Sequence, residues 1–172
     1  MIWVIVPAIA ALLALLAILV RSGLLRLRAS VQQSWAGLDA LLLERHDLLM
    51  QLAERCAAHM RYEMPVLERV SRADAATFAA AAQGDIPALA AAEKLLRSSV
   101  AELLALAENY PALGRDPAFA GLRARALAID AAIAERRELY NSAVNLLNVR
   151  SQAFPHRMVA QAIGLHAQAL FE

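Results

Sequence analysis

The chain has 172 residues, of which 60% are hydrophobic and only 5% aromatic, with six glycines and six prolines. Alanine and leucine, both strong helix formers, make up most of the hydrophobic part, so the composition favours an all-α protein and argues against a strand-and-turn fold. The 17 basic and 16 acidic side chains give a net charge of +1, which excludes a whole-molecule attraction to nucleic acid. Cys56, the single cysteine, cannot form an internal disulfide and lies on an apolar helix stripe, so we expect a buried, inert thiol.

The first element in chain order is an uncharged apolar segment over residues 2–20. As a helix this segment spans about 29 Å, close to the ~30 Å hydrocarbon core of a bilayer, and Trp3 would lie at the far interface. A cleaved signal peptide is the alternative, but no basic residue precedes the segment and no Ala-x-Ala site follows it. The sequence therefore predicts a transmembrane anchor over residues 1–22, contacting membrane lipid through residues 2–20, and a separate domain over residues 23–172.

The charges that flank the anchor predict its orientation. Arg21, Arg26 and Arg28 follow the apolar segment, and no acidic residue occurs before Asp39. Only the α-amine lies on the other side. The positive-inside rule then places the N-terminus outside and the C-terminal domain in the cytoplasm.

Helical periodicity begins again at about Ser30 and extends to about Tyr62, just before Pro65. This helix continues directly from the anchor unless Gly23 breaks it. A second helix is expected over residues 65–83, a third over residues 86–109, and a connector over residues 110–114. The predicted core face of the first domain helix consists of Val31, Trp35, Leu38, Leu42, Leu49, Leu52 and Cys56.

Asp116-Pro117 predicts the start of a long fourth helix, with Asp as the N-cap and Pro in the first turn. Its apolar residues follow a strict seven-residue repeat, which predicts left-handed, coiled-coil-like packing up to Pro155. This face consists of Phe119, Leu122, Ala126, Ile129, Ile133, Tyr140, Ala143, Leu147 and Phe154.

The chain after Pro155 is apolar and is expected to form another short helix. Because short connections make sequential helices antiparallel neighbours, the fourth helix must return toward the anchor. Residues 156–172 should therefore lie close to residues 24–35. They could lie in the membrane interface, but they lack the lysines, arginines and tryptophan of an interfacial helix, so we favour a fold-back that closes the core.

Arginines interrupt the two long apolar faces at Arg45, Arg136 and Arg150. The simpler interpretation is that their stems pack while their charged ends reach water. The alternative is a buried polar layer that pairs Arg136 or Arg137 with Glu44 or Asp47.

A search for chemistry in the sequence finds no site. Di-iron bundles use Glu-x-x-His pairs, and none occurs here. His59 and Glu63 share one helical turn, and His46 adjoins Asp47, but two ligands do not make a metal site. Hydrolase, dinucleotide and P-loop motifs are absent. The arginines alternate with Glu and Asp, as on a solvated helix face. We therefore predict no catalytic, cofactor-binding or metal-binding residue, and no nucleic-acid partner.

Motifs such as Trp35-x-x-Leu38-Asp39, Arg136-Arg137-x-x-Tyr140-Asn141 and Phe154-Pro155 follow one another along the chain. Their order and spacing resemble the LemA family of bacterial membrane-anchored helical proteins. The resemblance covers roughly residues 24–172, and two departures are Met50, where the family commonly has proline, and Tyr62-Glu63, where it usually has His-Glu. Upstream motifs include Val66-Leu67-Glu68 and Glu108-x-Tyr110-Pro111, and the chain closes with Phe171-Glu172. The family-motif positions are Trp35, Asp39, Arg45, Asp47, Tyr110, Pro111, Arg136, Arg137, Tyr140, Asn141, Asn148, Phe154 and Pro155.

The resemblance implies an elongated antiparallel, up-and-down bundle of about four helices plus a short C-terminal helix, behind one anchor in the bacterial inner membrane. It implies no enzymatic activity and only scattered links to membrane-associated processes. Our leading hypothesis is a membrane-anchored scaffold or adaptor that presents its bundle surface to a protein partner. The alternatives are a self-assembling membrane-surface protein, through close contacts of small residues between copies, and an enzyme of unrecognised type.

Overall fold

The computed structural model describes residues 2–60 and 62–171, although the side chains of residues 2–4 lie outside the described part, and with them the predicted position of Trp3. The described residues form helices and no strand, which confirms the all-α class. The six helices are α1 (Ile2–His59), α2 (Met64–Gln83), α3 (Ile86–Ala107), α4 (Pro111–Gly114), α5 (Pro117–Gln152) and α6 (His156–Ala162). The connector expected over residues 110–114 is the single turn α4.

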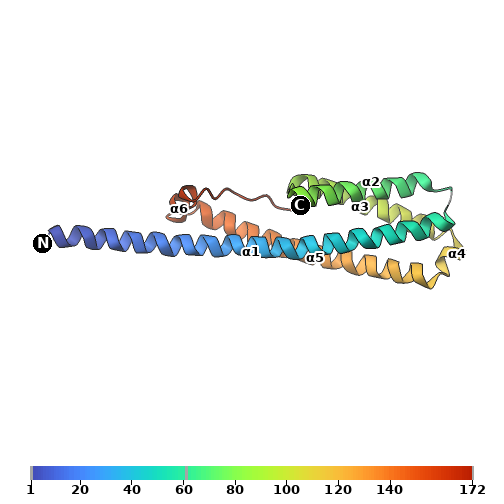
Figure 1. Cartoon of the computed structure of the whole chain (residues 1–172), viewed down its shortest axis with the longest axis horizontal. Coiled ribbons are helices and arrows are strands. Elements are labelled where there is room, and N and C mark those ends of the chain that lie inside the picture. The colour runs from blue at the N-terminus through green and yellow to red at the C-terminus, as the bar shows by residue number, and fades with distance from the viewer. Residues whose placement is uncertain (1, 61, 172) are drawn as a thin grey trace.

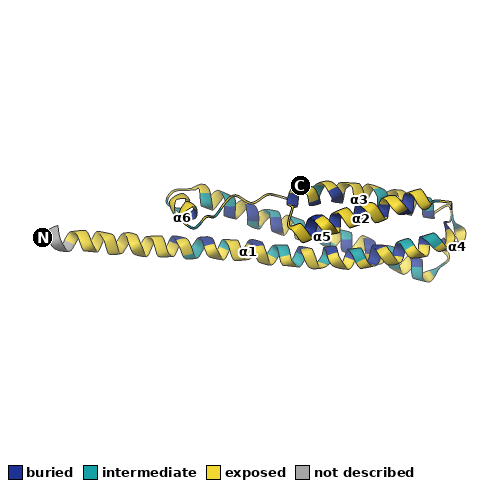
Figure 2. Cartoon of the chain, turned by 45° about the horizontal axis from the view of Figure 1, so that its top comes forward, coloured by how far each residue is buried: buried dark blue, intermediate teal, exposed yellow. Residues whose placement is uncertain are grey.

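Helix α1 joins the anchor to the domain without a break, passing through Gly23. Its N-terminal part is long and apolar enough to cross a membrane, and it is almost entirely exposed, as the yellow end of the helix in Figure 2 shows. An apolar helix that projects alone from a folded domain needs an apolar environment of its own. This supports membrane association of the chain.

Local capping explains where the domain helices begin and end. Gly84 has a φ of 65° and ends α2 in the left-handed conformation that glycine tolerates best. Asp85 accepts a hydrogen bond from the Ala88 N–H at 3.0 Å, and Asp116 accepts one from the Ala118 N–H at 2.9 Å. Both aspartates are therefore N-caps, and a proline follows each in the first turn.

The domain consists of two antiparallel helix pairs of unequal length. Helix α5 runs back along α1, and the shorter α2–α3 hairpin packs beside the part of this pair that lies away from the anchor (Figure 1). At 1.5 Å per residue, α5 is about 54 Å long and α3 about 33 Å. Roughly 20 Å of the α1–α5 pair nearest the anchor therefore extends beyond the hairpin.

The core faces predicted for the two long helices are largely confirmed. Trp35, Leu122 and Ala143 are half-buried, and the other apolar positions are buried, with Phe154 as the exception. Phe154 is 83% exposed, so its assignment to the core face was wrong: α5 ends at Gln152, and the helical repeat no longer applies. Cys56 is fully buried, and burial raises its pKa to about 11, which keeps the thiol protonated and inert as expected.

The chain after α5 returns to the anchor side, as predicted. Ala160 of α6 packs against Val20 and Leu24 of α1 in a small separate cluster, with Val159 and Ile163 beside it. Residues 165–171 then run back along the bundle, and Phe171 is 2% exposed in the main core. The favoured fold-back is thus confirmed at Phe171.

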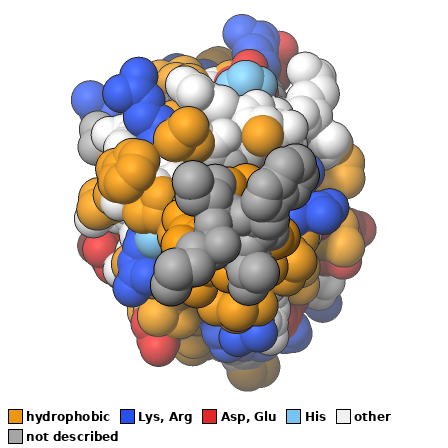
Figure 3. Space-filling model, turned by 90° about the vertical axis from the view of Figure 1, so that its left-hand side faces the viewer, with side chains coloured by type: hydrophobic (Ala, Val, Ile, Leu, Met, Phe, Trp, Pro, Cys, Tyr) orange, Lys and Arg blue, Asp and Glu red, His pale blue; other side chains and the backbone are white. Residues whose placement is uncertain are grey.

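The anchor end of the molecule combines apolar and basic side chains. Figure 3 looks along α1 from this end and shows hydrophobic side chains around the anchor, with both basic and acidic side chains at the outline of the molecule. Arg21, Arg26 and Arg28 are exposed where α1 leaves the apolar segment. These three arginines are suited to contact with lipid headgroups.

Two core substitutions test the helix pairing. Ile133 is buried, and Trp35 packs edge-on against Tyr140 with ring centroids 5.7 Å apart. Ile133→Ala and Trp35→Ala should each lower the free energy of unfolding by ~2–5 kcal/mol, because each removes a large side chain from packed surroundings. Denaturant melts of the full chain in detergent, followed by circular dichroism, measure this. Losses under about half a kcal/mol at both positions would contradict the assigned core faces.

Candidate functional site

Residues 165–171, which we call the strap, run in extended form along the part of α5 that the α2–α3 hairpin leaves uncovered. The side chains of residues 166–170 are exposed, and Leu165 is half-buried. The strap is therefore held mainly through its backbone and through Phe171.

Two asparagines of α5 bind the strap backbone, and each does so twice. The Asn141 side chain donates to the Phe171 carbonyl at 2.9 Å and accepts from the Phe171 N–H at 2.8 Å. The Asn148 side chain donates to the Gln168 carbonyl and accepts from the Gln168 N–H, both at 2.9 Å. The Tyr140 hydroxyl adds a bond to the Ala169 carbonyl at 3.2 Å. A side-chain amide thus satisfies one N–H and one C=O, as a neighbouring β-strand would.

The spacing of these asparagines matches an extended chain. Asn148 lies seven positions after Asn141 in the helix, which corresponds to a rise of about 10.5 Å. Phe171 lies three positions after Gln168 in the extended strap, which corresponds to a rise of about 10 Å. The asparagine pair therefore fits an extended backbone, and the hydrogen bonds of its side chains all go to backbone atoms of Gln168 and Phe171.

Phe171 is the apolar anchor of the strap. Its ring belongs to the main core cluster together with Ile86 and Leu89 of α3 and Tyr140 of α5. The Arg137 guanidinium lies 5.9 Å from the ring centroid, within cation–π range. We call Tyr140, Asn141, Asn148 and the recess that holds Phe171 the strap site.

A second polar feature lies in the middle of the bundle. Arg45 of α1, 6% exposed, forms a paired hydrogen bond with buried Glu93 of α3 and also contacts Asp130 of α5 at 3.4 Å. Burial alone would lower the pKa of Arg45, but Glu93 and then Asp130 outweigh it, and the pKa is raised. This buried charged group fixes the register of three helices at one level.

The expectation that Arg45 reaches water is thus wrong. Arg45 lies at the junction of the α1–α5 pair with the α2–α3 hairpin, where carboxylates from two other helices face it. The alternative pairing was also wrong, because Glu44 contacts Arg125 at 3.8 Å and Arg137 lies 3.9 Å from Glu138. Arg136 and Arg150 are exposed, as the simpler interpretation expected.

One histidine joins the layer that contains Arg45. His46 Nδ1 lies 2.6 Å from the buried carboxylate of Asp74 on α2, and the imidazole stacks on Phe78 with centroids 4.9 Å apart. Burial raises the pKa of Asp74 against the opposing hydrogen bond and charge of His46. Within the described residues, no group of three or more His, Cys, Asp and Glu side chains is placed to hold a metal ion.

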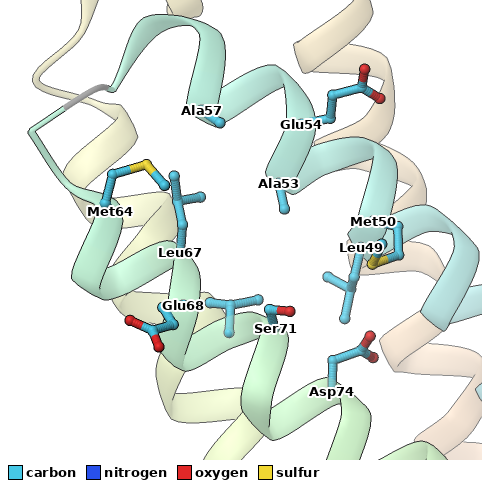
Figure 4. A pocket seen from close by; sticks show the side chains of 11 residues that line it. Leu49, Met50, Ala53, Glu54, Ala57, Met64, Leu67, Glu68, Ser71 and Asp74 are labelled. Atoms are coloured by element: carbon cyan, nitrogen blue, oxygen red, sulfur yellow. The ribbon is translucent and has the colours of Figure 1, made fainter.

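The third feature is an apolar groove of about 390 Å³ between α1 and α2. Figure 4 shows the small side chains of Ala53 and Ala57 on α1 facing Met64 and Leu67 on α2. These alanines leave the space open. Carboxylates line it as well. The groove lining consists of Leu49, Met50, Ala53, Glu54, Ala57, Met64, Leu67, Glu68, Val70, Ser71 and Asp74.

The structure divides the family-motif positions into two main groups. Trp35, Arg137, Tyr140, Asn141 and Asn148 gather around the strap, with Arg136 one residue away on α5. Tyr110 and Pro111 lie at the opposite end of the bundle, where the Tyr110 hydroxyl donates to Glu63 at 3.4 Å. Arg45 is buried between these ends, Asp39 and Asp47 are exposed, and Phe154-Pro155 leads into α6.

A comparison with models of protein families finds a match for the chain. The LemA family model covers residues 34–172, which include the whole strap site and the groove. The chain belongs to the LemA family. No curated protein matches its sequence. The LemA match begins at residue 34, after the apolar segment, so the assignment of that segment as a membrane anchor rests on its own length and composition.

Sequence reasoning missed three of the residues that build these sites. Glu93, Asp74 and Asp130 lie among alanines and exposed charges, and no local pattern marks Glu93 and Asp130 as partners of Arg45 or Asp74 as the partner of His46. The LemA motif did include Asn141 and Asn148, and their seven-residue spacing placed them on one face of α5. The strap as their ligand was not predicted.

The buried ion pair can be tested by breaking it and by replacing it. Glu93→Gln should lower the free energy of unfolding by about 3–5 kcal/mol, because Arg45 then keeps its charge with its main partner gone. The matched control Glu102→Gln breaks the exposed pair with Arg69 and should cost under ~1 kcal/mol. The double variant Arg45→Met with Glu93→Met should recover most of the loss. Equal stability of the two single Gln variants in denaturant melts would contradict the register role.

Proposed function

We propose that this LemA-family chain is a membrane-anchored adaptor without catalytic activity, whose α1–α2 groove binds a basic amphipathic helix of a protein partner at the membrane surface. The groove carries the proposal: it is apolar, open to solvent, and lies between α1 and α2 with a volume of about 390 Å³. Helix-in-groove binding uses this type of surface.

The lining of the groove matches an apolar helix face. Met50 and Met64 are 54% and 55% exposed on its two sides, and methionine side chains adapt to different ligand shapes. Ala53, Ala57 and Ser71 allow a partner backbone to approach closely. A volume of about 390 Å³ accommodates several apolar side chains, within the usual range for binding sites.

The charge of the groove favours a basic partner. Glu54, Glu68 and Asp74 line it, and no Lys or Arg does. Arg72 pairs with Glu68 at 2.9 Å at the exposed edge, whereas Glu54 has no ion pair within the described residues. Acidic edges attract and orient a helix that carries Lys or Arg beside its apolar face.

Site-specific photo-cross-linking in the native membrane tests the proposal. A photoreactive phenylalanine at position 50 or 64 should cross-link to one defined segment, and that segment should be a basic amphipathic helix. Glu54→Lys with Glu68→Lys should reduce the yield at least about tenfold through charge repulsion. The matched control is the same residue at Leu95, which is 63% exposed on α3 and outside the groove.

The cross-linked segment decides the outcome. Equal yields at positions 50 and 95, cross-links to general chaperones alone, or a target segment without basic residues would each contradict the adaptor proposal.

A further inference from the structure

The strap is bound in a way that suits exchange. Five hydrogen bonds join its backbone to the side chains of Tyr140, Asn141 and Asn148 of α5, and another joins the Leu165 N–H to the Ala160 carbonyl of α6. Only Phe171 is deeply buried, and the side chains of residues 166–170 face solvent. The strap site therefore contacts two backbone N–H and C=O pairs three residues apart and one aromatic ring, and none of these contacts involves the side chains of residues 168–170.

Helix α6 and the first residue of the strap are held together. Gly164, with a φ of 65°, follows α6, and the Leu165 N–H donates to the Ala160 carbonyl at 2.9 Å. Ala160 packs against Val20 and Leu24 of α1, and Leu165 packs against the same cluster. Release of the bound segment therefore involves residues 166–171, which follow Leu165, while α6 stays in place. Once released, the strap reaches about 20 Å in extended form.

A membrane anchor would bring the strap sites of two copies to the same level. Copies anchored in one membrane would share one direction and one height. The strap site lies along the part of the α1–α5 pair that the α2–α3 hairpin leaves uncovered. Two copies whose uncovered faces meet would therefore bring their strap sites together, with the same direction of binding relative to the membrane.

We propose that the strap site is a peptide-binding site and that two copies of this chain exchange straps, each strap filling the site of the other copy. Exchange keeps the five hydrogen bonds to α5 and the burial of Phe171, so its equilibrium depends on the strain of the chain after Leu165 and on the local concentration of copies. Confinement to one membrane raises that concentration. The ligand class is an extended peptide with an aromatic anchor, and the source is a second copy. This inference involves a different surface from the α1–α2 groove.

A mixed-pair experiment on full-length chains tests the exchange. One copy carries Asn141→Ala and Asn148→Ala, which leave its strap intact but remove its strap site. The other carries Gln168→Pro and Phe171→Ala, which leave its strap site intact but weaken its strap, since proline has no N–H for Asn148. With different tags and in the same lipid nanodiscs, this mixed pair should co-purify at least about tenfold more than either variant with itself.

Each variant with itself is the matched control, because it contains straps without sites or sites without straps. Co-purification of the mixed pair at the level of these controls would overturn the proposal. Circular dichroism verifies that the variants keep wild-type helix content. If a combined variant loses helix, the mixed pair is made from single variants: one copy carries Asn148→Ala and the other carries Gln168→Pro. Both positions lie on the solvent side of the strap.

A peptide experiment tests the binding mode separately. The probe is a synthetic peptide with the sequence of residues 163–172, and the receptor is the full chain carrying Gln168→Pro. N-methylation of the peptide at the position of Phe171 removes the N–H that Asn141 accepts and should weaken binding at least about tenfold. N-methylation at the position of Leu170, whose N–H has no partner among the described residues, should leave affinity within about threefold. No binding of the unmodified peptide, or equal effects of the two methyl groups, would overturn the proposed site. Substitutions in the α1–α2 groove should change neither experiment.

Discussion

The length mismatch between the two helix pairs is the constraint on which the structure depends. Helix α5 must return along α1 to reach the anchor. The α2–α3 hairpin, in contrast, turns at Gly84, because Gly84 ends α2 and Asp85 caps the start of α3. The part of the α1–α5 pair that the hairpin does not cover carries apolar residues, including Val31, Val144 and Leu147, on the side where the hairpin would continue. Leaving this face in water costs about 25 cal/mol per Å² of apolar surface. The strap covers it over about the same 20 Å.

The three sites follow from this division of the bundle. At the level where four helices are present, Arg45 can be surrounded by Glu93 and Asp130 and remain charged in the interior. Nearer the anchor, only two helices and an extended segment are present, so backbone groups need partners, and the side chains of Asn141 and Asn148 supply them. At the far end, α2 packs mainly against α3, and small residues on α1 leave the groove open.

Much of this could be predicted from the sequence, and the reason lies in periodicity. The apolar faces of α1 and α5, the Asp116 cap and the return of the chain to the anchor all follow from local patterns. The surroundings of Arg45 could not be predicted, because its partners Glu93 and Asp130 lie 48 and 85 residues away and carry no local signal. Phe154 was misplaced because its spacing continues the repeat beyond the end of the helix. Asn141 and Asn148 were recognisable as a motif, but their ligand has no regular secondary structure, and no helix or strand pattern indicates it.

Amide hydrogen exchange along the strap is the most direct test of its binding by the two asparagines. The Gln168 and Phe171 N–H groups donate to asparagine side chains, whereas those of residues 167, 169 and 170 have no partner within the described part of the chain. In the full chain in detergent, amides 168 and 171 should exchange at least about tenfold more slowly than amides 167, 169 and 170. Asn148→Ala should remove the protection of amide 168 first. Uniformly fast exchange over residues 166–171, with α5 itself still protected, would contradict the central claim that the asparagine pair holds the strap in place.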